Sequence, residues 1–136
     1  MTPVIKLPDN QDALAEILQL QDRLTTYLFE HAEAPVKRGS IEHIQETIAC
    51  LAVEASEALA PFLTGTKPWK PRDPDITHID EEMIDCLHYL ATYWNLRKMS
   101  SNDVLVEYRK KNFRNYQRLA DKLSAMEIIV VIAPKE

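Results

Sequence analysis

The amino-acid sequence predicts an all-α fold, a bundle of four to five helices with a short extended C-terminal tail. Apolar side chains recur every three or four residues through four segments of about twenty residues, joined by short connections. Only 2 of the 136 residues are glycine, whereas sandwiches and barrels need glycine in many tight turns. Because 46% of the residues are apolar, we expect one domain over residues 1–136, with its core at about 10–124 and the tail at 125–136.

The first two predicted helices each begin at a residue suited to capping. Asp9 or Asn10 can cap a first helix that runs to about Ala32, and Ser40 can cap the second. The second helix is expected to stop where the segment Pro61–Pro74 begins. This segment holds four of the eight prolines, which favours a non-helical loop.

The third and fourth predicted helices follow this loop. Asp75 or Thr77 can cap the third, and Ser100 or Ser101 can start a fourth helix through about Ser124. Residues 127–132 are mostly β-branched, which favours a short strand or an arm laid on a partner subunit.

Charge and composition exclude several functions. With 21 acidic and 16 basic residues the net charge is −5, so the surface should repel nucleic acid. The two glycines, Gly39 and Gly65, stand too far apart to build a backbone cradle for phosphate. No apolar run approaches the roughly 18 residues of a membrane span, and Cys50 and Cys86 form no C-x-x-C pair. We therefore expect a cytoplasmic protein with no nucleic-acid or membrane partner.

Two pairs of acidic residues lie among the apolar residues of the second and third predicted helices. Glu54 and Glu57 lie three residues apart and share a helix face, as do Glu82 and Asp85. If the helices pack by their apolar stripes, the four carboxylates converge along one edge. Converging carboxylates repel one another, and a divalent cation removes this repulsion. All-oxygen ligation suits Mg²⁺, with Mn²⁺ as a substitute. The alternative is a set of solvated or salt-bridged acids at the edge of a bundle.

A di-iron carboxylate bundle is a weaker alternative. Asp85-x-x-His88 matches one carboxylate-x-x-His element, but Ala60 stands where the second histidine should follow Glu57. The remaining histidines have no zinc-ligand spacing, which favours surface or capping roles for His31, His43 and His78.

The fourth predicted helix is cationic and carries amide side chains. Lys111, Asn115 and Arg118 share one face, Tyr108 adjoins them, and Asn112 lies about a quarter-turn away. Point charge from Lys, planar donors from Arg and hydrogen bonds from Asn suit a polyphosphate beside a cation. The alternative is a solvated basic face on an acidic protein.

The paired motifs Glu54-x-x-Glu57 and Glu82-x-x-Asp85 resemble the metal motif of the all-α nucleoside triphosphate pyrophosphatases, the group of MazG-like enzymes and dimeric dUTPases. Further segments are similar to the dimeric dUTPase branch and occur in the same order, three of them in predicted helices and Pro68-Trp69-Lys70 in the predicted loop. They are Leu20-Gln21-Asp22-Arg23-Leu24, Pro68-Trp69-Lys70, Asp85-Cys86-Leu87-His88-Tyr89 and Tyr108-x-x-Lys111-Asn112-x-x-Asn115-x-x-Arg118.

The resemblance implies a role for each matching residue. Metal ligands would be Glu54, Glu57, Glu82 and Asp85; phosphate would meet Tyr108, Lys111, Asn112, Asn115 and Arg118; the base would meet Gln21, Thr25, Trp69, His88 and Tyr89. Three positions depart from the family pattern. Val53 stands where many members have a Glu, Thr25 where dUTPases have an Asn, and Tyr89 where they have a Phe. The last two changes bear on which base is read.

The expected activity is Mg²⁺-dependent hydrolysis of a nucleoside triphosphate, dUTP to dUMP and pyrophosphate, in a bundle of the all-α pyrophosphatase type. Glu54 would accept the proton of a water, while Lys111 and Arg118 offset developing charge. The resemblance implies a homodimer or a dimer of dimers. The alternatives are the same chemistry on dCTP or a non-standard nucleotide, and a helical interaction module without enzymatic activity.

Overall fold

The computed structural model describes residues 12–63 and 75–132, and in these ranges it contains four α-helices and no strand. The helices are α1 (Ala13–His31), α2 (Ile41–Leu63), α3 (Ile76–Leu96) and α4 (Ser101–Ile132), so the predicted all-α class is confirmed. The chain divides into two units, Met1–Ser101 and Asn102–Glu136. The first unit contains α1, α2 and α3. That all 136 residues act as one domain stays a prediction.

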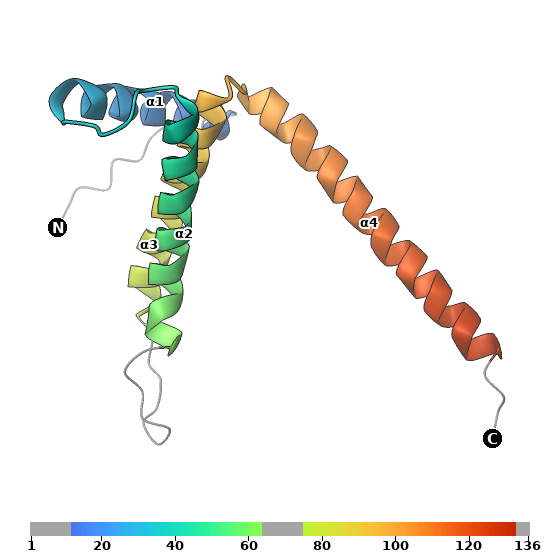
Figure 1. Cartoon of the computed structure of the whole chain (residues 1–136). Coiled ribbons are helices and arrows are strands. Elements are labelled where there is room, and N and C mark those ends of the chain that lie inside the picture. The colour runs from blue at the N-terminus through green and yellow to red at the C-terminus, as the bar shows by residue number, and fades with distance from the viewer. Residues whose placement is uncertain (1–11, 64–74, 133–136) are drawn as a thin grey trace, which may run out of the picture. The chain divides into compact units, whose positions relative to one another are not determined.

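Within the first unit, α2 and α3 lie side by side and run in opposite directions (Figure 1). α1 lies across the end of this pair where α2 begins and α3 ends (Figure 1). A hydrogen bond joins α1 to α3 across 77 residues of sequence, because Asn95 Nδ2 donates to the Leu18 carbonyl at 2.8 Å. The three helices thus form a frame that holds side chains from different parts of the chain.

The core of the described residues is built from small side chains. The buried apolar residues are Leu18, Ala58, Cys86 and Ala91. Three buried threonines each donate their hydroxyl hydrogen to the carbonyl one helical turn earlier, Thr25 to Gln21, Thr47 to His43 and Thr92 to His88. Their polar groups are therefore satisfied inside the fold.

The cap of α1 differs from the prediction. α1 starts at Ala13, so Asp12 is its cap and not Asp9 or Asn10, which lie outside the described residues. The Asp12 carboxylate accepts hydrogen bonds from the Ala15 N–H at 2.9 Å and the Ser101 hydroxyl at 2.8 Å. These two bonds lower the pKa of Asp12, the Ala15 bond having the larger effect.

α2 begins as predicted and ends later. The Ser40 hydroxyl accepts from the His43 N–H at 3.2 Å, as expected of a helix cap. The predicted stop at Pro61 is wrong, since the helix continues through Pro61 to Leu63. A proline this close to a helix end removes one hydrogen bond, the one to the Glu57 carbonyl, and no further turn depends on it.

α3 has well-defined caps at both ends. The Asp75 carboxylate accepts from the N–H groups of Thr77 and His78, which confirms the predicted start. At the other end, Met99 N–H bonds to the Trp94 carbonyl and Lys98 N–H to the Asn95 carbonyl, a Schellman motif. Lys98 accordingly has a φ of 55°, in the left-handed region where glycine is usual.

α4 is longer than predicted, since it runs through Ile132 instead of ending near Ser124. The predicted extended tail or strand at 127–132 is therefore wrong. No proline or glycine interrupts Ser101–Ile132, and the weak helix propensity of β-branched residues costs only about 0.5 kcal/mol each. Among the described residues, no helix has an apolar stretch long enough to cross a bilayer.

Candidate active site

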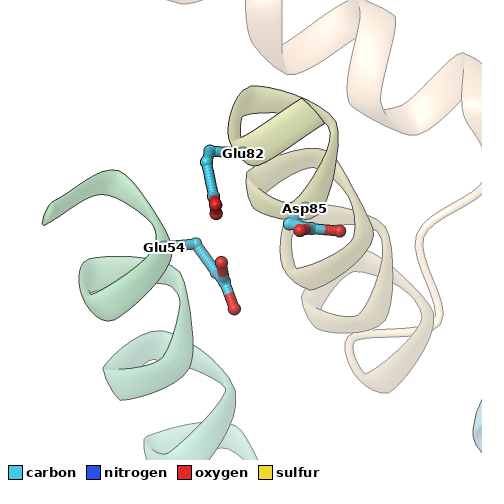
Figure 2. Close-up of side chains that lie close together, drawn as sticks. All are labelled: Glu54, Glu82 and Asp85. Atoms are coloured by element: carbon cyan, nitrogen blue, oxygen red, sulfur yellow. The ribbon is translucent and has the colours of Figure 1, made fainter. Parts of the chain in front are cut away.

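Three carboxylates from α2 and α3 come together near the middle of the helix pair. One oxygen each of Glu54, Glu82 and Asp85 lies within 4.8 Å of the others. Figure 2 shows Glu54 on α2 and Glu82 on α3 with their carboxylates directed toward each other, and Asp85 one turn further along α3. The antiparallel pairing of α2 and α3 thus brings the two halves of the predicted motif into one cluster.

The cluster strongly affects the charge of Glu54. Its pKa rises to about 6, first because partial burial disfavours the charged form, and next because Glu54 shares a hydrogen bond with Glu82. The negative charges of Glu57, Asp85 and Glu82 raise it further. Burial and the negative charges of Glu54, Asp85 and Glu82 also raise the pKa of the Cys86 thiol. Glu54 is therefore a carboxyl group that exchanges its proton near neutral pH.

The donor set fits a hard divalent cation. It consists of carboxylate oxygens only, and their mutual repulsion is what a bound cation relieves. Oxygen ligands of this kind are preferred by Mg²⁺ and Mn²⁺ over soft metals. The di-iron alternative finds less support, since the described residues that form the cluster include no histidine.

Glu57 is the predicted ligand that lies outside the cluster. It lies one helical turn beyond Glu54, and because α3 runs the other way it faces an earlier part of that helix. Glu57, Glu82 and His78 line a pocket of about 320 Å³, together with Ala60 and Pro61. Glu57 thus borders the cluster from an adjoining pocket.

Three of the predicted base-binding residues line a second pocket. Gln21 and Thr25 of α1 and Tyr89 of α3 surround a cavity of about 220 Å³, which Cys50 of α2 also lines. Burial raises the pKa of the Tyr89 hydroxyl, as do its hydrogen bond to Cys50 and the charges of Glu54 and Asp85. Tyr89 therefore connects this pocket to the carboxylate cluster.

The other two base-binding predictions fall elsewhere. His88 lines a different pocket of about 370 Å³, bordered by apolar side chains and by Gln21. Gln21 lies between the two pockets and borders both. Trp69 lies outside the described residues.

The predicted phosphate-binding residues all lie on α4. Lys111, Asn115 and Arg118 recur along it at the expected spacing, with Tyr108 and Asn112 beside them. Lys110, the neighbour of Lys111, forms an ion pair on α4, with its Nζ 3.0 Å from Glu107 Oε1. The second unit thus carries these side chains on an exposed helix, and their role in phosphate binding stays a prediction.

Sequence reasoning missed two histidines of this region. His78 contacts Glu82, with 3.2 Å between Nε2 and Oε1. His43 is buried against Phe29 and lines the pocket of Gln21 and Tyr89. Burial lowers the pKa of His43, and the positive charge of Arg38 lowers it further. The four-residue spacing from His78 to Glu82 is the one signal the sequence offers, and it is common on helix surfaces.

Comparison with known proteins places this geometry in a family. A family model described as dUTPase matches residues 13–102, which span α1, α2, α3 and the carboxylate cluster. No curated protein and no solved structure matches the chain. The matched region covers well over half of the 136 residues and contains both acidic motifs. The chain therefore belongs to the dUTPase family, as its resemblance to the all-α nucleoside triphosphate pyrophosphatases predicted.

Proposed function

We propose that this protein is a Mg²⁺-dependent pyrophosphohydrolase that cleaves a nucleoside triphosphate, with dUTP as the first candidate, to the monophosphate and pyrophosphate. The observation that carries the proposal is the cluster of Glu54, Glu82 and Asp85 inside the region matched by the dUTPase family. When bound there, a divalent cation offsets phosphate charge and lowers the pKa of a water molecule. Mn²⁺ can substitute, because it accepts the same oxygen ligands.

The side chains of the cluster divide the work. Glu82 and Asp85 would hold the cation from α3, and Glu54 would complete the set of ligands from α2. Glu54 is also the proposed proton acceptor for the attacking water, because an ionised carboxylate beside a cation site can take up the proton of a water molecule held there. Glu57 would add a further carboxylate from the adjoining pocket.

The nucleobase occupies the pocket of Gln21, Thr25 and Tyr89. This pocket lies next to the cluster, since Tyr89 is influenced by the charges of Glu54 and Asp85. The Thr25 hydroxyl donates its hydrogen to the Gln21 carbonyl at 2.9 Å, so it offers the base an acceptor and no donor. The Gln21 amide is then the principal reader of the base, and a cytosine base is the alternative to uracil.

The phosphates meet Lys111, Asn112, Asn115 and Arg118 of α4, with Tyr108 at the edge of this set. Lys111 supplies a compact charge and Arg118 a planar pair of donors, which offset charge as the phosphate bond breaks. The active form is a homodimer or a dimer of dimers, in line with the assembly that the family resemblance implies.

The proposal is tested by product analysis. The purified protein is incubated with Mg²⁺ and a panel of dUTP, dCTP, dTTP and non-standard triphosphates, and the phosphorus products are separated. We expect a monophosphate and pyrophosphate in equal amounts. Glu82→Gln should lower kcat/KM at least about 100-fold, since it removes charge from the cation site. Glu81→Gln is the matched control, because it makes the same change on the exposed neighbouring residue.

Three results would contradict the proposal. If no nucleotide is hydrolysed, the enzymatic function is wrong and the helical interaction module is favoured. If orthophosphate is the direct product, cleavage occurs at a different bond. If Glu82→Gln is as active as Glu81→Gln, the carboxylate cluster is not the active site.

A further inference from the structure

His78 contacts one of the three clustered carboxylates from outside the cluster. Its Nε2 lies 3.2 Å from Oε1 of Glu82, four residues later on α3. Half of the His78 side chain is exposed, whereas only 12% of the Glu82 side chain is. Because water has little access to Glu82, a donor from the protein replaces a water hydrogen bond that burial has removed.

The cap of α3 fixes the position from which His78 reaches Glu82. The Asp75 carboxylate accepts from the N–H of Thr77 at 3.1 Å and of His78 at 3.3 Å. His78 is therefore part of a closed first turn, and the four-residue spacing places its imidazole beside Glu82. The contact between His78 and Glu82 therefore depends on the capped first turn of α3, which fixes the backbone of His78.

The nearest groups on the other side of Glu82 are anionic. Glu54 shares a hydrogen bond with it, and an oxygen of Asp85 lies within 4.8 Å. A glutamate side chain with several rotatable bonds loses conformational freedom when it binds a cation. A second contact that fixes it beforehand reduces this loss, as hydrogen bonds to metal-ligating carboxylates commonly do.

His78 also borders the space beside the cluster. It lines the pocket of about 320 Å³ that contains Glu57 and Glu82. Glu82 thus lies between this pocket and the cluster with Glu54 and Asp85, and the contact with His78 is on its pocket side. Within the part of the chain that the structure describes, His78 is the one basic side chain paired with a member of the cluster.

We propose that His78 is a positioning residue for cation binding: its Nε2–H holds the Glu82 carboxylate in the orientation that joins Glu54 and Asp85 around a divalent cation. The inference rests on the proposed function, because it takes the cluster to be a cation site. It requires an imidazole with its hydrogen on Nε2, and no change of charge on His78.

The test measures cation binding without nucleotide. Mn²⁺ is titrated into the metal-free full-length protein in a calorimeter. We expect His78→Leu to bind Mn²⁺ about 10-fold more weakly than wild type. His78→Gln keeps an N–H donor at a similar reach and should restore most of the affinity. His31→Leu is the matched control, since His31 contacts the Tyr27 carbonyl of its own helix.

A second measurement separates positioning from folding. In nucleotide hydrolysis, the Mg²⁺ concentration for half-maximal rate should rise about 10-fold in His78→Leu while kcat at saturating Mg²⁺ stays at the wild-type value. The metal-free Tm of His78→Leu should match that of His31→Leu.

Each alternative result is informative. Equal Mn²⁺ affinity in wild type and His78→Leu overturns the inference, and so does an equal loss in His78→Leu and His78→Gln. A loss of affinity with a matching fall in metal-free Tm indicates a structural role and overturns it too. If wild type binds no Mn²⁺, both the proposed cation site and this inference are wrong. If wild type binds Mn²⁺ and Glu82→Gln does not, the cluster is the cation site, and the affinity of His78→Leu then tests the role of His78 separately.

Discussion

At the scale of single residues, Glu54 is the carboxyl group on which the most influences act together. Partial burial, a hydrogen bond to Glu82 and the charges of Glu57 and Asp85 all raise its pKa, to about 6. In the unfolded chain none of these acts, so the metal-free folded protein binds this proton more tightly than the unfolded chain does. Glu54 therefore links folding, pH and cation binding.

The sign of this linkage gives a pH prediction. Between pH 4.5 and about 6, raising the pH should reduce the contribution of Glu54 to the free energy of unfolding, because the folded state holds the extra proton. In thermal melts with a chelator, the Tm difference between Glu54→Gln and wild type should grow in favour of the variant over this range. Addition of Mg²⁺ should raise the wild-type Tm more at pH 7 than at pH 5, because the cation competes with the proton.

Comparison with Glu54→Gln cancels the groups that titrate alike in both proteins, such as His43, whose pKa shift does not involve Glu54. A Tm difference that stays constant from pH 4.5 to 7 would show that the pKa of Glu54 is not raised. If Mg²⁺ raises the Tm by the same amount at pH 5 and pH 7, the cation does not compete with the proton of Glu54.

Helix geometry decides which residues of the candidate site can be predicted from the sequence. The three-residue spacing within each acidic pair was enough to predict that Glu54, Glu82 and Asp85 share a seam. It was not enough for Glu57, because its distance from the cluster depends on the opposite direction of α2 and α3 and on their relative shift. His78 was missed for another reason. A histidine four residues before a glutamate resembles an ordinary surface pair until the burial of Glu82 is known.

At the scale of helices, the ends of α3 are defined by different means. Its start depends on a side chain, since Asp75 accepts two backbone hydrogen bonds. Its end depends on the backbone, since the Schellman motif requires Lys98 to take a φ of 55°. The start of α3 can therefore be predicted from Asp75, whereas its end cannot, because Lys98 stands at the position where glycine is usual.

Lys98 offers a test of this helix end. Lys98→Gly should stabilise the protein by about 0.5 kcal/mol, because glycine lowers the cost of the left-handed conformation by more than it loses in unfolded-state entropy. Thermal melts should show a rise in Tm of about 2 °C. Lys98→Ala is the control, since alanine keeps a Cβ and the same backbone cost. A lower Tm for Lys98→Gly would contradict this account of the motif.

The two errors at helix ends share a physical cause. Pro61 predicted a stop and the β-branched run at 127–132 predicted a strand, yet both segments are helical. Local preferences of this kind are worth a few tenths of a kcal/mol to a few kcal/mol, and position decides their effect. A proline in the last turn removes one hydrogen bond, and a β-branched run without a breaker can continue a helix.

At the scale of the whole molecule, the described residues of the first unit, taken by themselves, bury little apolar surface. The buried apolar side chains are Leu18, Ala58, Cys86 and Ala91, and none of the large side chains is fully covered. In the first unit, Leu20, Leu24 and Ile84 are each at least 40% exposed and line the same pocket. A continuous apolar surface of this kind favours contact with another protein surface.

The proposed homodimer should be visible in solution. Sedimentation equilibrium should give a mass of twice the 15.7 kDa of one chain, and Tm should rise with protein concentration. Ile84→Glu should shift the equilibrium toward the monomer, because it places a charge on the exposed apolar pocket. Leu59→Glu is the matched control, since Leu59 is similarly exposed on α2 and does not line that pocket. A monomer at every concentration would contradict the proposed assembly.

The frame of three helices also has an evolutionary consequence. Under the proposed function, α1 supplies the side chains that read the base, Gln21 and Thr25, while α2 and α3 hold the carboxylates that perform the chemistry. Asn95 ties α1 to α3 through the Leu18 carbonyl, a backbone group that every amino acid provides. Mutation can therefore exchange the base-reading side chains of α1 without moving the helix or altering the reaction. Duplicated copies of such a gene have a short route to new substrates, and Gln21 and Thr25 are the positions on α1 where that divergence would be recorded.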